Sequence, residues 1–131
     1  MVSAKKVVLL VESDPLSCEL YTRELAKVYD VKACCDSASA LRLVQSMPPD
    51  LILIEPALAG DDGWGLLAHF KGNPHTMSIP VVICSTIDER RRGMRLGAIV
   101  YLVKPVSAAT LNEEVHRVLA SMSVESKGEN T

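Results

Sequence analysis

The sequence predicts an α/β fold in which a doubly wound parallel sheet of five strands is covered by five helices. Short apolar runs alternate five times with longer segments of helical periodicity, which is the pattern of repeated strand–helix units. Apart from the second run, which contains Lys32, the runs are apolar throughout, so these strands should be buried on both faces, as in parallel sheets. A length of 131 residues with 48% hydrophobic residues suits one domain with an aliphatic core.

The first unit combines an apolar run at residues 7–11 with a helix that begins near Pro15. Ser13 or Asp14 is the expected N-cap, and Pro15 suits the first helical position because a backbone N–H there has no helical partner. The apolar side chains expected on the buried face of this helix are Leu16, Leu20, Tyr21, Leu25 and Val28.

The next two strands are expected at residues 31–35 and 51–54. Asp36 or Ser37 can cap the second helix, which should end before the prolines at 48 and 49. A glycine-containing loop follows residue 54 and leads into a third helix. That helix should bury Leu66, Leu67 and Phe70 before it ends at residues 72–74.

The last two strands are expected at residues 81–84 and 100–103, with a short helix at about 88–96 between them. Gly97 suits the position just after that helix, where a left-handed backbone is common. The final helix repeats apolar residues at helical spacing up to Met122. We therefore expect a domain over residues 1–122 and a polar, disordered tail over residues 123–131.

Polar side chains follow four of the five expected strands. They are Glu12, Ser13 and Asp14 after the first strand, Glu55 after the third, Ser85 after the fourth and Lys104 after the fifth. Because ligands bind beyond the carboxyl ends of parallel strands, these side chains should form one site. Acids beside a hydroxyl and a lysine favour phosphoryl or metal binding. The alternative for Glu55 is a loop carboxylate that caps the next helix, but its place directly after a buried strand favours the site.

Composition excludes several other classes of protein. A net charge of −2 argues against a nucleic-acid binder. The five apolar residues after Lys6 are too few for a signal peptide or a membrane span. The four cysteines (18, 34, 35 and 84) have neither metal-site nor disulfide-framework spacing, so we expect reduced thiols and a cytoplasmic protein.

Four segments carry a resemblance to a known family: VESDP, LILIEPALAGDDGW, IPVVICST and GAIVYLVKP. In this order and spacing the chain resembles the receiver domain of bacterial two-component response regulators, from residue 6 to about 122. The resemblance implies a flavodoxin-like sheet in the order 2-1-3-4-5. It also implies an acidic Mg²⁺-binding pair at Glu12 and Ser13, a phosphoacceptor position at Glu55, phosphoryl contacts from Ser85 and Lys104, and a switch aromatic at Tyr101.

Two of these positions depart from the family pattern. Ser13 offers a neutral hydroxyl where an acid is expected, and Glu55 is one methylene longer than the usual aspartate. Because Mg²⁺ prefers carboxylate oxygens in near-octahedral geometry, we expect weak or absent Mg²⁺ binding through Glu12 and Glu55, and no other cofactor. Asp14 either compensates for the missing acid or acts only as the N-cap. A Glu55–Lys104 ion pair is a further expectation.

We therefore expect a stand-alone, non-enzymatic signalling module that acts by protein–protein interaction without depending on phosphorylation. No DNA-binding domain follows the last helix, so output should pass through another signalling protein, such as a histidine kinase or an output protein. Its expected contact surface is the fourth helix, the fifth strand and the fifth helix, and a homodimer is an alternative. The arginines at 90, 91, 92 and 95 belong either to that surface or to an ordinary solvated helix face.

Two alternatives remain. The first is a working receiver that accepts a phosphoryl group with Mg²⁺ in a phosphorelay. The second, ranked lower, is a flavodoxin-like cofactor carrier; acids at Glu12 and Asp14 would repel the phosphate of such a cofactor. Neither a nucleic acid nor a membrane is an expected partner.

Overall fold

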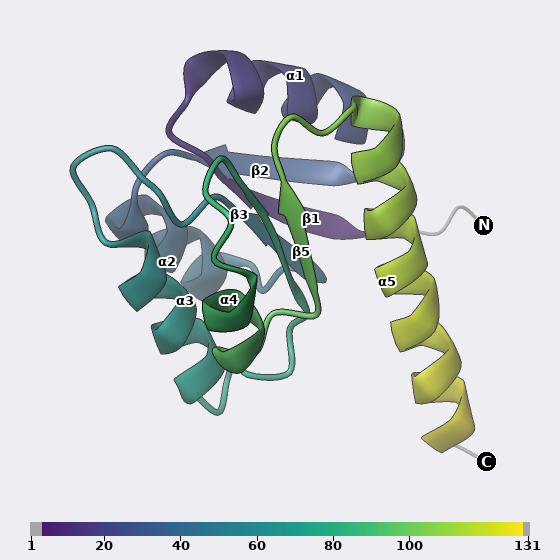
Figure 1. The fold of residues 1–131 in the computed structure, drawn as a ribbon. Helices are drawn as coiled ribbons and strands as arrows, with labels where there is room; N and C mark the ends of the chain where they lie inside the picture. Colours follow the sequence, from purple (N-terminus) through teal and green to yellow (C-terminus); the bar gives the residue numbers. More distant parts are fainter. Residues whose placement is uncertain (1–3, 130–131) are drawn as a thin grey trace.

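A computed structural model describes residues 4–129, with side chains to Ser123, and confirms a parallel sheet in the order β2-β1-β3-β4-β5. The strands are β1 (Val7–Val11), β2 (Asp30–Cys34), β3 (Leu51–Ile54), β4 (Val81–Ser85) and β5 (Val100–Val103). The helices are α1 (Pro15–Leu25), α2 (Ser37–Ser46), α3 (Gly63–Gly72), α4 (Arg90–Arg95) and α5 (Ala108–Glu129). Figure 1 shows α1 and α5 on one side of the sheet and α2, α3 and α4 on the other.

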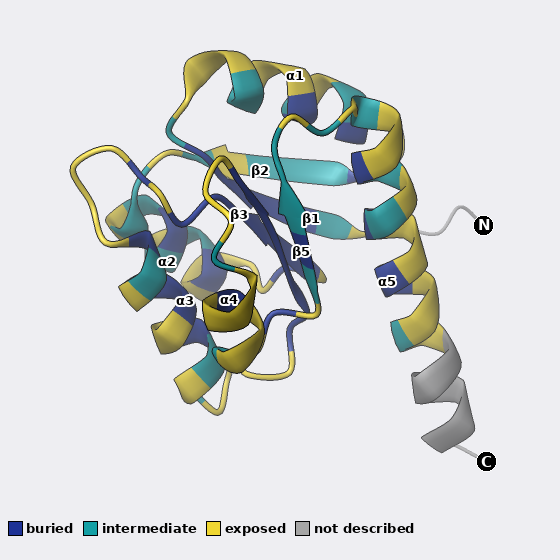
Figure 2. Cartoon of the chain, in the orientation of Figure 1, coloured by how far each residue is buried: buried dark blue, intermediate teal, exposed yellow. Residues whose placement is uncertain are grey.

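The sheet separates two layers of core. Side chains alternate along each strand, so Leu9 and Ile52 pack with α2 and α3, while Leu10 and Leu53 pack with α1 and α5. β3 and β4 are buried throughout, and β1 is buried after Val7, as Figure 2 shows in dark blue. This burial on both faces explains why their sequences are continuous apolar runs.

Aspartate caps set the starts of three helices. Asp14, Asp36 and Asp62 each accept a hydrogen bond from a backbone N–H three residues later, at 3.0, 2.7 and 2.8 Å. Pro15 occupies the start of α1, as expected. These caps confirm the starts expected for the first two helices, because each satisfies an N–H that has no intrahelical acceptor.

The prediction of which α1 side chains are buried is partly wrong. Tyr21 and Leu25 are buried, but Leu16 is 77% exposed, and Leu20 and Val28 also face solvent. The reason is that α1 lies over the β1–β2 edge of the sheet and against α5, so it contacts the core along a narrow stripe. Val28 lies beyond the end of the helix at Leu25.

Several element boundaries also differ from expectation. β2 begins one residue earlier, β4 includes Ser85, and α4 is shorter because residues 87–89 form turn contacts with Ser85 and Tyr101. α5 continues past Met122 to Glu129, through most of the segment expected to be a disordered tail. Residues 130–131 of that tail lie outside the described residues. Across residues 4–129, no helix combines the length and apolar character that crossing a membrane requires.

Candidate functional site

Glu12 and Lys104 form a buried ion pair at the carboxyl edge of the sheet. Glu12 follows β1 and Lys104 follows β5, and their side chains are 3% and 11% exposed. Lys104 Nζ donates to Glu12 Oε1, and the Asp14 N–H donates to Glu12 Oε2 at 3.1 Å. Both oxygens of the Glu12 carboxylate are therefore engaged within the protein.

Glu55, directly after β3, bonds to a hydroxyl and not to the lysine. Its Oε1 accepts a hydrogen bond from Ser85 Oγ at 3.1 Å, and both residues are buried. The prediction of a Glu55–Lys104 ion pair is thus wrong, because the lysine reaches across the sheet edge to the carboxylate of Glu12, which follows β1. A buried charge needs a partner, and the lysine gives one to Glu12.

The second oxygen of Glu55 has no hydrogen-bond partner among the described residues, although it is buried. Burial raises the pKa of this carboxyl above its ordinary value, while the hydrogen bond from Ser85 and the positive charge of Lys104 act in the opposite direction. Glu55 Oε2 is consequently the one oxygen of the two buried carboxylates that has no hydrogen-bond partner among the described residues.

Ser13 ties the loop that follows β3 to the start of α1. Its Oγ accepts a hydrogen bond from the Ala59 N–H at 3.1 Å, and the Ser37 N–H donates to Asp61 of the same loop at 2.6 Å. Leu58, which directly precedes Ala59, is buried. The residue that replaces the expected acid therefore serves as a hydrogen-bond acceptor for a backbone loop.

Asp14 is exposed and acts as the N-cap of α1. Hydrogen bonding by Ser17 lowers the pKa of its carboxyl, as expected for a capping carboxylate. Of the two roles considered for this residue, the structure assigns the cap. Its side chain makes its hydrogen bond to α1 and makes none to Glu12 or Glu55 in the described part of the chain.

These donors do not fit a Mg²⁺ ion, which prefers several free oxygen ligands near octahedral positions. Both oxygens of Glu12 and the hydroxyl of Ser13 are engaged, which leaves Glu55 Oε2. Within residues 4–123, no group of three or more His, Cys, Asp and Glu side chains is placed to hold a metal ion. The ammonium group of Lys104 lies against the carboxylate that the family resemblance assigns to the metal.

Tyr101 on β5 is buried beneath α4. Its hydroxyl donates to the Ile87 carbonyl oxygen and accepts from the Glu89 N–H at 3.0 Å. Ser85 Oγ also accepts from the Ile87 N–H at 3.1 Å. Ser85 and Tyr101, to which the resemblance assigns a phosphoryl contact and a switch aromatic, are thus connected through the same loop between β4 and α4.

The sequence reasoning missed two residues that border this site. The ring of Tyr21, from α1, lies 5.9 Å from Lys104 Nζ, and Cys84 Sγ lies 3.8 Å from the Tyr21 hydroxyl. Burial is the main cause of the raised pKa of Tyr21, and the nearby Cys84 adds to it. Helical periodicity did predict that Tyr21 is buried, but it carries no information on which end of the sheet a tyrosine hydroxyl will meet.

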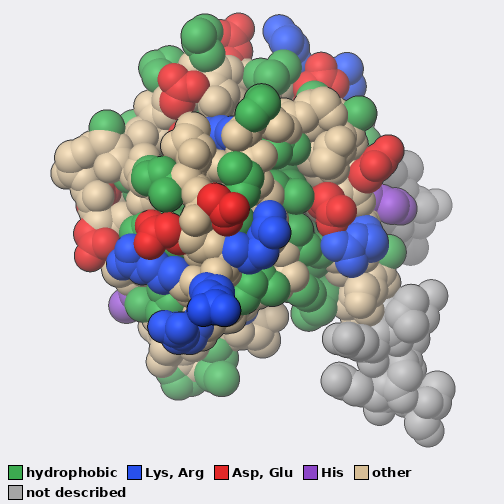
Figure 3. All heavy atoms as spheres, viewed as in Figure 1, with side chains coloured by type: hydrophobic (Ala, Val, Ile, Leu, Met, Phe, Trp, Pro, Cys, Tyr) green, Lys and Arg blue, Asp and Glu red, His purple; other side chains and the backbone are tan. Residues whose placement is uncertain are grey.

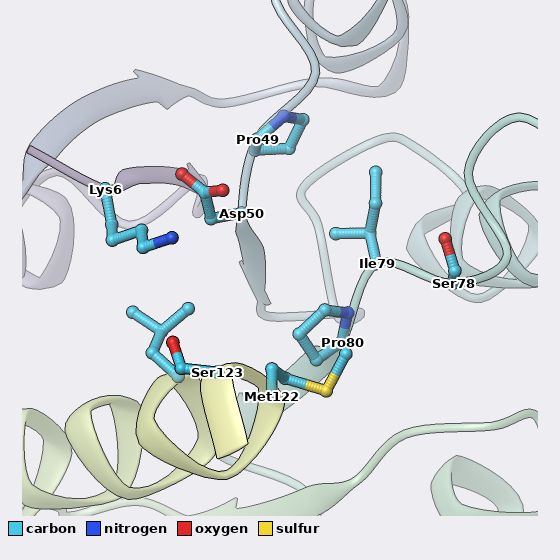
Figure 4. Close-up of a pocket in the computed structure, with 9 residues that line it drawn as sticks. Lys6, Pro49, Asp50, Ser78, Ile79, Pro80, Met122 and Ser123 are labelled. Carbon is cyan, nitrogen blue, oxygen red and sulfur yellow. The ribbon is translucent and has the colours of Figure 1, made fainter. Parts of the chain in front are cut away.

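A cavity of about 430 Å³ lies at the opposite edge of the sheet, where strands begin. Figure 4 shows Lys6 and Asp50 on one side of it and Met122 of α5 on another. The Asp50 carboxylate accepts a hydrogen bond of 2.7 Å from the Val7 N–H and so anchors the start of β1. The acids, hydroxyl and lysine of the candidate site do not line this cavity.

Comparison with known proteins identifies relatives over most of the chain. The profile of the response regulator receiver domain matches residues 8–116. A Vibrio cholerae protein named "Probable cyclic di-GMP phosphodiesterase" is 32% identical over 112 residues, which cover 83% of this chain and 25% of that protein. Protein PilH of Pseudomonas aeruginosa is 29% identical over 117 residues, which cover 86% of this chain and 97% of PilH.

Solved structures agree with this match. The signal receiver domain of a signal transduction histidine kinase from Syntrophus aciditrophicus superposes with a TM-score of 0.80 at 27% identity, covering 88% of this chain and 91% of that one. The chemotaxis response regulator CheY4 of Vibrio cholerae has a TM-score of 0.81 at 22% identity, covering 88% and 99%, and this likeness supports the fold alone.

Proposed function

Because this chain belongs to the response regulator receiver family, we propose that it is a signalling module that acts through protein–protein contacts and does not depend on phosphorylation. The observation that carries the proposal is the buried pair between Lys104 and Glu12 beside the Glu55–Ser85 hydrogen bond. The groups that would bind a cation and a phosphoryl group are already bonded to one another.

The chemistry of phosphoryl transfer supports this proposal. Transfer depends on a nucleophile placed to a fraction of an ångström and on a cation that neutralises the developing charge. Glu55 is one methylene too long, and it contacts Ser85, the hydroxyl that a receiver uses for a phosphoryl oxygen. The engaged oxygens of Glu12 support the proposal that Mg²⁺ binding is weak or absent.

The proposed partner is another signalling protein, such as a histidine kinase or an output protein, which would bind α4, β5 and α5 in the cytoplasm. A second copy of the chain is the alternative partner. The chain spans 25% of the Vibrio cholerae relative, so the phosphodiesterase activity in that protein's name is not extended to this chain.

A working phosphoacceptor is the second candidate, and one observation favours it. Glu55 Oε2 has no hydrogen-bond partner among the described residues, so this buried oxygen would be the nucleophile once the site opens. In this alternative, Ser85 would release Glu55 and contact the phosphoryl group.

One experiment separates the two candidates. The protein is incubated with Mg²⁺ and acetyl phosphate, and its intact mass is then measured over time. We expect no phosphoryl gain for the native chain and a transient gain for Ser13→Asp/Glu55→Asp, which restores the family's usual acids. A gain by the native chain that Glu55→Gln abolishes would establish the working receiver. Failure of the double variant to gain mass would show that these two residues are not the cause.

A further inference from the structure

We infer that α4 and the segments on either side of it form a docking surface for an acidic protein segment that also carries apolar side chains. This surface, called here the arginine face, consists of Arg90, Arg91, Arg95, Ile87, Met94 and Ile99. The inference rests on the proposed function as an interaction module and adds the chemistry of the partner.

The packing of Gly93 sets the orientation of α4. A Cβ atom at this position would lie 2.6 Å from a ring carbon of Tyr101 and 2.7 Å from Ile83 Cδ1, so the helix rests against the sheet at Gly93. Successive helical residues are about 100° apart, which places Arg91 and Arg95 on the opposite side, one above the other. Both are exposed.

The four arginines of α4 differ in how far the fold uses them. Arg92 lies 3.6 Å from the Glu89 carboxylate and stacks 4.3 Å from the centre of the Trp64 ring. None of the ion pairs found among side chains 4–123 includes Arg90, Arg91 or Arg95. Figure 3 shows Lys and Arg side chains gathered over α4. Three guanidinium groups are thus available to an external carboxylate.

Apolar side chains accompany these cations. Ile87 precedes α4, Met94 lies within it and Ile99 follows it, and they are 47%, 44% and 45% exposed. Arginine and methionine are both enriched in protein interfaces, where apolar groups supply burial and guanidinium groups supply direction. The combination suits a segment with alternating acidic and apolar side chains.

Charge decides between the candidate occupants. In a symmetric dimer centred on α4, Arg91 and Arg95 of one copy would face Arg91 and Arg95 of the other. These like charges would repel each other. A nucleic-acid backbone would bring a row of phosphates against Asp88 and Glu89 and would leave the exposed Ile87, Met94 and Ile99 without apolar partners. A protein segment can place a few carboxylates at the arginines and cover these apolar side chains as well.

The test uses the full chain and a fluorescent synthetic helix with glutamates on one face and leucines on the other. We expect binding by the native chain that weakens about tenfold or more for Arg91→Glu/Arg95→Glu. The matched control Arg23→Glu/Arg42→Glu has the same net charge on other helices and should bind within about twofold of the native chain. Replacing the peptide's glutamates by glutamines, or making Met94→Ser/Ile99→Ser, should also weaken binding.

Three results would overturn the inference. One is equal binding of the peptide by the two arginine double variants, and another is binding of a short DNA duplex by the native chain as tightly as the peptide. A concentration-dependent dimer that disappears in Arg91→Glu/Arg95→Glu would assign the surface to a second copy. Thermal unfolding confirms that each variant is folded. None of these substitutions alters the phosphoryl site, so the mass experiment tests the proposed function separately.

Discussion

Replacing Lys104 by methionine should strongly destabilise the protein at neutral pH. The substitution keeps a side chain of similar length but leaves the Glu12 carboxylate, 3% exposed, without its cation. Removing one partner of a buried ion pair costs about 3–5 kcal/mol of unfolding free energy, because the remaining charge is uncompensated. The Asp14 N–H still donates to Glu12 and offsets a small part of that loss.

Urea unfolding followed by circular dichroism measures the effect. With a denaturant slope of about 2 kcal/mol per molar urea, the midpoint should fall by about 2 M. Adding Glu12→Gln to Lys104→Met removes the stranded charge, so most of the stability should return. Lys27→Met breaks the exposed pair with Glu24 and is the matched control, for which we expect almost no change.

Two outcomes of this double-mutant cycle would contradict the prediction. A loss below about 1 kcal/mol for Lys104→Met would show that the pair contributes no more than a surface salt bridge. A double variant as unstable as Lys104→Met alone would show that the lysine stabilises the fold through some contact other than Glu12.

Two further substitutions test neighbouring parts of the fold. Gly93→Ala should lower the unfolding free energy by about 1–3 kcal/mol in the same assay, because the new methyl group meets the ring of Tyr101, whose hydroxyl is hydrogen-bonded. The control is Gly72→Ala, which should not lower it, because a Cβ atom at residue 72 would have no neighbour within 4 Å. Glu55→Gln should stabilise the protein increasingly as pH rises. Burial raises the pKa of Glu55 in the folded protein. The native chain therefore keeps its full unfolding free energy below pH about 4.5 and loses part of it as pH rises through the folded pKa. The glutamine of the variant stays neutral, so the variant has no such loss. Thermal unfolding from pH about 4 to about 8 that shows a constant difference would contradict this.

Local patterns predicted most of the elements correctly. Continuous apolar runs located β3 and β5 to the residue. β3 is buried on both faces, which requires apolar side chains at each position, whereas β5 lies at the sheet edge and is only partly buried. Capping residues located the starts of α1 and α2, because the N–H groups of the first turn need nearby acceptors. The extent of α1's buried face was not predictable in the same way, since it depends on how far α5 and the edge strand cover the helix.

For the candidate site, the sequence by itself determined which side chains gather at the carboxyl edge of the sheet, because parallel strands all end there. Only the tertiary structure decided which of them bond. Lys104 reaches Glu12, Glu55 turns to Ser85, and Ser13 holds the loop at Ala59. These choices depend on distances between side chains from four different strands and their loops, which no local pattern encodes. The same holds for Gly93, whose contact with Tyr101 turns the arginines of α4 toward solvent.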